Sequence, residues 1–289
     1  MTITPEITLS RDHATAIAEL RDQWGALDGV EEDLLGPRLI EQRLDALLRS
    51  ELRSKVVALW AKHDHVVVRN VPPADDGSTG LLIGALLFRT LKAYRAGRVI
   101  KRFQMSPWTT ALSHTLAQGS FHTDINTAEQ PPAGTLTQCL VPDPDAPTHG
   151  QLRVARFHDL LAALRADGAT AACRLLTDDH VVMVNDASPT HWSGRIFDGH
   201  TVRFHPETLR AAQRRLASNP PDLEEILQVI HDASMAVSSP IELAAGEILI
   251  VSNRRALHQR GACTVRFRSF PRDFETRSVA VMHVMDEPS

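Results

Sequence analysis

Residues 246–260 read GEILIVSNRRALHQR, and this stretch decides the fold. Its apolar run, ILIV, is short and rich in β-branched side chains, which is typical of a buried strand. Gly246 comes just before this run and separates it from another extended, apolar segment. The pattern therefore predicts strand, glycine turn and strand over residues 239–253, with His258 beyond the second strand.

The rest of the chain mixes strands with helices. Apolar residues at helical spacing predict helices, and short β-branched or aromatic runs between turn residues predict strands. The predicted helices are residues 10–62, 80–97, 158–168 and 219–234, and the predicted strands are residues 65–73, 98–105, 119–125, 134–141, 151–157, 180–186, 263–270 and 277–285. This order predicts a β-rich α+β fold, a double-stranded β-helix (jelly roll) core with flanking helices.

The sequence contains no internal repeat, no low-complexity segment and no linker. We therefore predict a single domain over residues 1–289. Within it, residues 1–62 are expected to form an N-terminal helical region that packs on the jelly roll. Residues from about 157 to 235 are expected to form a helical insertion and lid.

Composition argues against several classes of partner. The net charge is −4, with 31 basic and 35 acidic residues, so we expect no nucleic-acid partner. No apolar stretch reaches the roughly 18 residues of a membrane helix, and the N-terminus lacks the pattern of a signal peptide. The 3 cysteines are too few and too scattered for a disulfide framework. We therefore expect a cytoplasmic protein that does not bind membranes, and the oligomeric state stays open.

Two segments carry residues that suit a metal ion. SFHTDI (residues 120–125) holds His122 and Asp124, whose side chains point the same way if the segment is a strand. His258 lies far along the chain, so only the fold can bring it to the same place. Two imidazoles and one carboxylate form a facial triad that leaves three positions open, which suits Fe(II). The competing interpretation is a chance pattern in a chain with 14 histidines.

Four arginines follow the last of these histidines: Arg266, Arg268, Arg272 and Arg277. A guanidinium grips a carboxylate through two parallel hydrogen bonds and stays charged when it is buried. A 2-oxoacid that chelates iron through its keto-acid end needs such a grip on its far carboxylate. An inward-facing arginine on the next strand would supply it. The competing interpretation is that these arginines are solvated charges at a strand edge.

These motifs resemble two related families. HTD followed by PPAG (residues 131–134) is similar to the taurine dioxygenase family. GEILIVSNRRALHQR, followed by Arg266-Phe267 and by an arginine fourteen residues after the last histidine, resembles the clavaminate synthase-like branch of the same superfamily. The likeness spans residues from about 65 to 280. It implies a double-stranded β-helix, Fe(II), 2-oxoglutarate and O2, with decarboxylation of 2-oxoglutarate coupled to oxidation of a substrate C–H bond.

Carried over position by position, the resemblance implies that His122, Asp124 and His258 are the iron ligands, with no catalytic residue beyond them. Arg272 would bind the far carboxylate of 2-oxoglutarate. A threonine that helps to hold this carboxylate in the family matches the stretch THGQLRV. Thr148 or Gln151 could play that part, and the sequence does not choose between them.

The chain departs from the clavaminate synthase-like pattern at two positions. Those hydroxylases often use Glu where Asp124 stands, but either carboxylate coordinates iron. They also tend to carry a second arginine four residues after the co-substrate arginine, where this chain has Thr276. An inherited substrate preference is therefore not implied. A carboxylate at position 124 argues against a halogenase, which in this superfamily leaves that position vacant for chloride.

Substrate contacts are predicted on weaker grounds. Gln118, Ser120 and Asn126 would share the strand face of His122 and could hydrogen-bond a polar substrate. Asp186 stands where the resemblance places acidic substrate contacts. Each of these residues could equally be an ordinary polar residue at a strand end.

Three functions are compatible with this sequence. The first is hydroxylation of an unactivated C–H bond in a small polar substrate, an amino acid or amino-acid derivative, free or tethered to a carrier, with formation of succinate and CO2. The second keeps the same cofactors but leads to desaturation, cyclisation or epoxidation. The third is a non-catalytic jelly-roll protein that binds an anionic ligand through its arginines.

Overall fold

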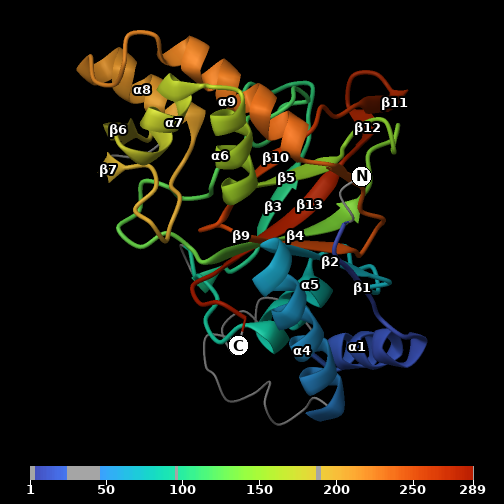
Figure 1. The fold of residues 1–289 in the computed structure, drawn as a ribbon. Coiled ribbons are helices and arrows are strands. Elements are labelled where there is room, and N and C mark those ends of the chain that lie inside the picture. The colour runs from blue at the N-terminus through green and yellow to red at the C-terminus, as the bar shows by residue number, and fades with distance from the viewer. Residues whose placement is uncertain (1–3, 25–45, 95–96, 187–189, 289) are drawn as a thin grey trace.

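The computed structural model describes residues 4–24, 46–94, 97–186 and 190–288. Its largest sheet has six strands in the order β1-β2-β9-β4-β13-β3. These are β1 (Glu6–Thr8), β2 (His65–Arg69), β9 (Ile248–Ser252), β4 (Gly134–Val141), β13 (Ser278–Val284) and β3 (Lys101–Gln104). Neighbouring strands are antiparallel except β1 and β2. Segments from both halves of the chain therefore lie side by side in this sheet (Figure 1).

A second, three-stranded sheet contains His258. Its order is β10-β5-β8. Its strands are β10 (Ala256–Arg260), β5 (Leu152–Arg156) and β8 (Pro240–Ile241). Two further pairs of strands form separate hairpins: β6 (His180–Val184) with β7 (His191–Arg195), and β11 (Val265–Ser269) with β12 (Asp273–Thr276). Because β10 is not part of the large sheet, any site that joins His258 to β4 or β13 must form between the two sheets.

The described helices form two groups (Figure 1). The first group packs on the large sheet, and the second belongs to the insertion between β5 and β9. The helices are α1 (Arg11–Trp24), α4 (Ala46–His63) and α5 (Ser78–Leu87) in the first group, and α6 (Phe157–Ala166), α7 (Thr170–Thr177), α8 (Pro206–Leu216) and α9 (Leu223–Val237) in the second. In the described part of the chain, no helix has the length and apolar character needed to cross a membrane.

The large sheet is covered on both faces, which explains the continuous apolar runs in its sequence. On β2, Val66 and Val68 pack with the N-terminal helices, while Val67 packs with residues of the three-stranded sheet. The residues of β9 alternate in the same way. By this alternation, Thr135 on β4 and His283 on β13 face the three-stranded sheet, because their neighbours in sequence pack with the helices.

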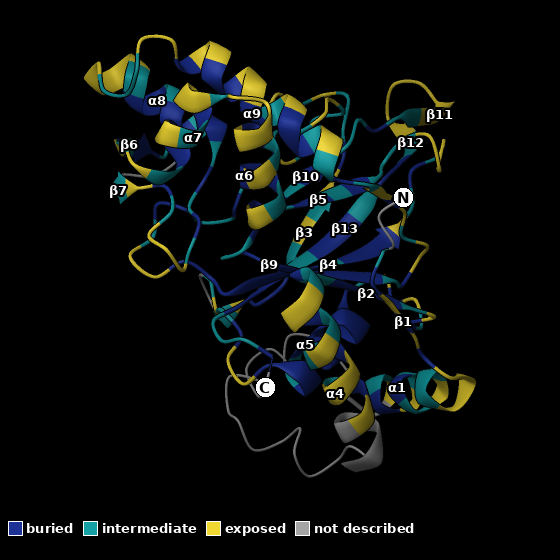
Figure 2. Ribbon diagram, viewed as in Figure 1, coloured by how far each residue is buried: buried dark blue, intermediate teal, exposed yellow. Residues whose placement is uncertain are grey.

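The insertion has a core of its own. Figure 2 shows exposed outer faces on α8 and α9, and their inner faces are buried. Phe121 and Leu257, the residues just before His122 and His258, belong to the same apolar cluster as these helices. The insertion therefore packs directly against the two segments that carry the histidines.

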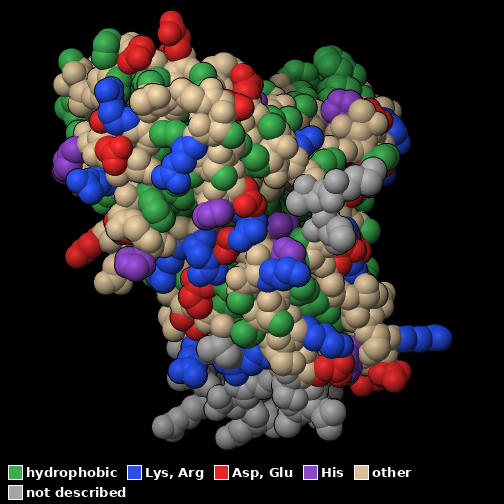
Figure 3. All heavy atoms as spheres, viewed as in Figure 1, with side chains coloured by type: hydrophobic (Ala, Val, Ile, Leu, Met, Phe, Trp, Pro, Cys, Tyr) green, Lys and Arg blue, Asp and Glu red, His purple; other side chains and the backbone are tan. Residues whose placement is uncertain are grey.

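Basic and acidic side chains are interspersed on the face shown in Figure 3. Among the described residues, many charged side chains are paired: Arg69 lies between Glu6 and Glu247, and Arg268 pairs with Glu275. An exposed pair such as Arg268 with Glu275 contributes up to about 1 kcal/mol to stability. The main effect of these pairs is to mix the two signs of charge on the surface.

The predicted fold class is confirmed in its coarser form, a sheet-rich mixture of helices and strands. The helix predicted over residues 80–97 is too long, because α5 ends at Leu87. The chain then runs along the end of β13, where the N–H of Lys92 donates to the carbonyl of His283 at 2.8 Å. Pairing with a distant strand replaces the helical hydrogen bonds, and helical spacing alone does not reveal it.

The strand predicted over residues 119–125 is also wrong. Only His122 forms a bridge, which is antiparallel and isolated, and a turn begins at Asp124.

Two predicted regions are described only in part. Residues 25–45 of the N-terminal helical region and residues 187–189 of the lid lie outside the described residues.

Candidate metal centre

His122 and His258 face each other across a backbone bridge. The N–H of each residue donates to the carbonyl of the other, both at 3.0 Å. This bridge joins the segment between β3 and β4 to β10, and the centroids of the two imidazole rings lie 4.5 Å apart. Backbone pairing therefore brings together two histidines that are distant in sequence.

Asp124 completes the group. Its Oδ1 lies 3.5 Å from His122 Nε2, and its Oδ2 lies 3.4 Å from His258 Nε2. One nitrogen or oxygen atom from each of the three side chains lies within 4.8 Å of the other two. Within the described residues, this is the one group of three or more His, Cys, Asp or Glu side chains spaced to hold a metal ion. The structure thus brings together the three residues that the sequence singled out.

Asn253 fixes the backbone of Asp124. Its Oδ1 accepts a hydrogen bond from the N–H of Asp124 at 2.6 Å, and its Nδ2 donates to the carbonyls of Asp124 (3.0 Å) and Pro132 (3.1 Å). The side chain is buried directly after β9. An amide suits this position because it both accepts and donates. Asn253 therefore ties the turn that begins at Asp124 to the end of a central strand.

Two further side chains hold the carboxylate itself. Thr135 Oγ1 donates to Asp124 Oδ2 at 2.8 Å, and His283 Nε2 lies 3.0 Å from the same oxygen. The other ring nitrogen of His283, Nδ1, is hydrogen-bonded to the hydroxyl of Tyr94. The carboxylate is therefore oriented from the large sheet, while the two histidines of the group are oriented by the bridge to β10.

Burial and neighbouring charges set the protonation states. Burial alone would raise the pKa of Asp124, but the nearby imidazoles of His258, His283 and His122 hold that pKa well below its ordinary value. Burial lowers the pKa of His258. Burial would also lower the pKa of His122, but the hydrogen bond and charge of Asp124 raise it overall. The ionised carboxylate and neutral His258 are the forms in which these groups bind a cation.

The donor set suits a ferrous ion. Two imidazole nitrogens and one carboxylate oxygen, without a thiolate, are the donors that leave positions open for oxygen chemistry on Fe(II). His122 Nδ1 bonds to the carbonyl of Ser120 at 2.8 Å, which leaves Nε2 directed at Asp124. His258 Nδ1 is buried without a hydrogen-bond partner, and its Nε2 also faces Asp124. The residues present therefore fit an iron bound through both Nε2 atoms and the carboxylate.

A buried arginine directly precedes the strand that carries His283. Arg277 directly precedes β13 and is 3% exposed, and within the described part of the chain its guanidinium has no hydrogen bond or ion pair. Burial lowers the pKa of Arg277 from its ordinary value. The charge of Arg260 acts to lower the pKa of both Arg277 and His122, so Arg260 lies within electrostatic range of each. Because buried charges are normally paired, this guanidinium indicates an anionic ligand.

The expectation that Arg272 faces inward is wrong. Arg272 lies in the turn of the β11–β12 hairpin and is exposed to solvent. Arg266 and Arg268 on β11 are exposed as well. The hairpin carries three of the four arginines outward before the chain enters β13, so Arg277 is the one that is buried.

Thr148 and Gln151 lie in the loop between β4 and β5. Thr148 is exposed, and the Nε2 of Gln151 donates to the carbonyl of Pro147 at 2.5 Å. Gly150 approaches the buried arginine closely, because a Cβ at that position would lie 3.1 Å from Arg277 Cδ. The loop therefore passes against Arg277, while the side chain of Gln151 is engaged within the loop.

The four predicted substrate contacts do not gather at one place. Gln118 is exposed, and Asp186 is exposed and pairs with an arginine of α8 at 2.9 Å. Asn126 is buried, and its Nδ2 bonds to a threonine hydroxyl of α8 at 2.8 Å. Ser120 alone among the four lines a pocket next to the metal-binding group. The side chains of Asp186 and Asn126 thus contact helix α8 of the insertion.

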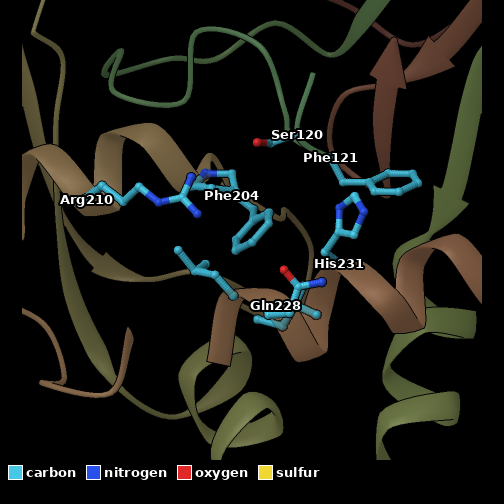
Figure 4. A pocket seen from close by; sticks show the side chains of 9 residues that line it. Ser120, Phe121, Phe204, Arg210, Gln228 and His231 are labelled. Carbon is cyan, nitrogen blue, oxygen red and sulfur yellow. The ribbon is translucent and has the colours of Figure 1, made fainter. Parts of the chain in front are cut away.

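The pocket at Ser120 has a volume of about 200 Å³. Its walls are Ser120, Phe121, Phe204, Pro206, Arg210, Leu227, Gln228, Ile230 and His231. Figure 4 shows polar groups of Ser120, Arg210, Gln228 and His231 around the ring of Phe204. None of His122, Asp124 and His258 is part of the wall, so the pocket adjoins the group and does not contain it.

Sequence analysis missed the residues that hold Asp124: Thr135, Asn253, His283 and, behind it, Tyr94. The period of two within β4 and β13 could have placed Thr135 and His283 on a polar face, because residues next to each are apolar. Nothing in the sequence indicates the contact of Tyr94, which lies in a segment with helical spacing.

Several solved structures share this fold. Asparagine oxygenase in complex with Fe(II), 2S,3S-3-hydroxyasparagine and succinate is 16% identical, with 97% of this chain and 93% of that chain covered and a TM-score of 0.69. The non-haem iron oxygenase OrfP with Fe, succinate and (3R,4R)-dihydroxy-L-Arg is 17% identical, with coverages of 97% and 94% and a TM-score of 0.68. OrfP with Fe and alpha-ketoglutaric acid is 19% identical, with coverages of 98% and 94% and a TM-score of 0.66.

Comparison of sequences identifies the family. A search of curated protein sequences gave no significant match. In contrast, residues 32–270 match the family model described as "Taurine catabolism dioxygenase TauD, TfdA family". The matched region covers most of the chain and contains His122, Asp124 and His258, and it ends before Arg277. The chain belongs to the TauD, TfdA family of dioxygenases.

Proposed function

We propose that this protein is an Fe(II)- and 2-oxoglutarate-dependent oxygenase that hydroxylates an unactivated C–H bond of a small polar substrate, an amino acid or amino-acid derivative. The observation that carries the proposal is the convergence of the half-buried side chains of His122, Asp124 and His258 in a member of a dioxygenase family. The complexes of asparagine oxygenase and OrfP with hydroxylated amino acids support the substrate class.

We also propose that the six-stranded and three-stranded sheets are the two halves of a double-stranded β-helix. The position of His258 on one sheet, opposite Thr135 and His283 on the other, supports this assignment. The single domain over residues 1–289 and the cytoplasmic location remain predictions from the sequence.

Three side chains would hold the iron: His122, Asp124 and His258. An iron ion held there together with 2-oxoglutarate would supply the oxidising chemistry, with succinate and CO2 as co-products. The protein itself contributes by holding the three ligand side chains in fixed positions. The backbone bridge fixes the two imidazoles, and Asn253 fixes the main chain of the carboxylate. The insertion packs behind both histidines and limits the access of water from that side.

Arg277 would bind the far carboxylate of 2-oxoglutarate. Its guanidinium is buried, planar and without a protein partner, which suits a two-point grip on a carboxylate. This assignment replaces Arg272, whose exposed position on the hairpin does not favour it. Thr148 and Gln151 remain predicted helpers, supported by the contact of their loop with Arg277.

Ser120 is the predicted substrate contact that the geometry favours, because it lines the pocket next to His122. Gln118, Asn126 and Asp186 have less support, since they are exposed or bonded within the insertion. The same residues would serve hydroxylation, desaturation, cyclisation or epoxidation. Only the product distinguishes these reactions.

Anaerobic titration with Fe(II) and 2-oxoglutarate tests the cofactor assignment. We expect a visible charge-transfer band in the wild-type protein and no band in His258→Ala. His200→Ala is the matched control, because His200 is an exposed histidine of the insertion and should leave the band unchanged. A wild-type protein without the band would contradict the oxygenase and favour the non-catalytic binding protein.

Succinate formation with a panel of free and carrier-bound amino acids then tests the substrate class. A hydroxylated product gains the mass of one oxygen atom, and a desaturated product loses two hydrogen atoms. Succinate production that no amino acid or amino-acid derivative stimulates would overturn the proposed substrate class and leave the cofactor assignment intact.

A further inference from the structure

His283 stands between Tyr94 and Asp124. Its Nε2 lies 3.0 Å from Asp124 Oδ2, and its Nδ1 is hydrogen-bonded to the Tyr94 hydroxyl. His283 is 3% exposed. The ammonium of Lys101 lies over the ring of Tyr94, 3.8 Å from its centroid. The result is a partly buried series of hydrogen bonds that ends on the carboxylate of the proposed metal site.

The Tyr94 hydroxyl selects the tautomer of His283. A neutral imidazole has one nitrogen that donates and one that accepts. Burial, together with the charge of Asp124, raises the pKa of Tyr94, so the phenol stays protonated and its O–H can donate a hydrogen bond to Nδ1. The Nε2 of His283 then carries the ring proton and donates to Asp124 Oδ2.

The two oxygens of Asp124 have different surroundings. Oδ2 accepts hydrogen bonds from both Thr135 and His283, and one carboxylate oxygen has about two lone-pair sites. Among the described residues, Oδ1 accepts no hydrogen bond. His122 Nε2 lies 3.5 Å from Oδ1 and His258 Nε2 lies 3.4 Å from Oδ2, and both nitrogens are directed at the proposed metal position. Oδ1 is therefore the oxygen left for a cation.

We propose that His283 and Tyr94 are positioning residues that make Asp124 a one-oxygen ligand. The inference rests on the proposed metal site. With Oδ2 filled by two donors, the three protein side chains would supply three donor atoms and leave three positions for co-substrate and O2. Loss of the His283 N–H would free Oδ2 for the metal, so that Asp124 could take two positions instead of one.

Co(II) binding to the iron-free protein tests this inference without turnover. Binding is measured by titration calorimetry and by the visible ligand-field spectrum of bound Co(II). We expect His283→Ala to weaken Co(II) binding by roughly 10–100-fold, as is typical when the partner of a ligand is removed, and to change the spectrum. Wild-type affinity and an unchanged spectrum in this variant would overturn the inference.

A double-mutant cycle separates tautomer control from packing. A glutamine amide donates without a tautomer, so His283→Gln should retain most of the Co(II) affinity. Tyr94→Phe keeps the ring and should weaken binding several-fold in the wild-type background, but it should have no effect in the His283→Gln background. An equal effect of Tyr94→Phe in both backgrounds would show that Tyr94 acts by packing and would overturn its assigned role.

Trp60→Phe is the matched control for these variants. Trp60 is buried, and its indole N–H bonds to Glu287 outside the proposed site. This variant should lower the unfolding temperature and leave Co(II) affinity unchanged. If the wild-type protein binds no Co(II), both the metal site and this inference are overturned. If it binds Co(II) and the Tyr94 and His283 variants bind Co(II) with the same affinity, only the inference is overturned.

Discussion

His283 and Thr135 are cross-strand partners on β13 and β4, and both hydrogen-bond the same oxygen of Asp124. Met282 and Leu136, their apolar neighbours, pack with the N-terminal helices on the opposite face. Two adjacent strands thus present a pair of donors at fixed spacing on the face that meets the three-stranded sheet. The carboxylate is oriented by a rigid sheet before any ligand binds, which is the arrangement expected of a preorganised site.

Thr135→Val should weaken the proposed site without changing the shape of the side chain. The substitution removes one of two donors to a half-buried carboxylate, and hydrogen bonds to charged groups contribute about 1.5–3 kcal/mol. We expect weaker Co(II) binding, measured by calorimetry, and a lower free energy of unfolding in urea. Thr137→Val is the control, because Thr137 lies two residues further on the same face of β4. Equal effects of the two substitutions would contradict a specific role for the Thr135 hydroxyl.

Arg277→Ala should raise the KM for 2-oxoglutarate strongly. Loss of one partner of a buried charge pair costs about 2–5 kcal/mol, which corresponds to roughly 30-fold to several thousand-fold. Arg272→Ala should leave the KM unchanged, because Arg272 is exposed on the hairpin. Succinate formation as a function of 2-oxoglutarate concentration measures both. A large effect of Arg272→Ala alone would contradict this prediction and would favour Arg272 as the residue that binds the far carboxylate of 2-oxoglutarate.

The contrast between these arginines shows what the sequence could and could not predict. The metal-binding role of His122, Asp124 and His258 could be predicted from residue type, because few kinds of side chain bind iron. The inward arginine was predicted from a fixed count of residues after His258. The β11–β12 hairpin occupies that part of the chain and exposes Arg272, and only the three-dimensional path of the hairpin distinguishes it from Arg277.

The partners of Asp124 were not predictable for a different reason. Thr135 and His283 act together because β4 and β13 are paired in one register, and a single sequence does not specify which strands are neighbours. Tyr94 was assigned to a helix because its segment has apolar residues at helical spacing. Contacts with the end of β13 override that local preference.

Asp64→Asn should destabilise the protein although Asp64 is not part of the site. Its carboxylate is buried between Arg255 (2.6 Å) and Arg156 (3.1 Å). Breaking a buried ion pair by removing one charge typically costs about 3–5 kcal/mol. Asparagine tolerates the left-handed backbone at this position (φ 60°), so the change tests charge and not strain. We expect a lower midpoint of urea unfolding, whereas Asp159→Asn, at a largely exposed pair with Arg156, should have little effect.

The stability of the metal-free protein should fall between neutral and mildly acidic pH, and His65 should cause part of the fall. Burial lowers the pKa of His65 on β2 to about 4, from an ordinary value of 6.5. The unfolded chain therefore binds a proton below about pH 6.5 that the folded chain does not bind until about pH 4. The contribution is fully favourable to folding above pH 6.5 and is lost as the pH falls through this window, by at most about 3 kcal/mol.

His65→Gln removes this titration, so the difference in unfolding free energy between about pH 7.5 and pH 5 should be smaller in the variant than in the wild-type protein. Urea unfolding in the presence of a chelator measures the difference at both pH values. Other buried histidines, such as His205 with a pKa lowered to about 3 by burial, keep part of the pH dependence in the variant. His158→Gln, at an exposed position on α6, is the control. An identical pH dependence in wild type and His65→Gln would mean that His65 is protonated in the folded protein, and that its position on β2 is open to water.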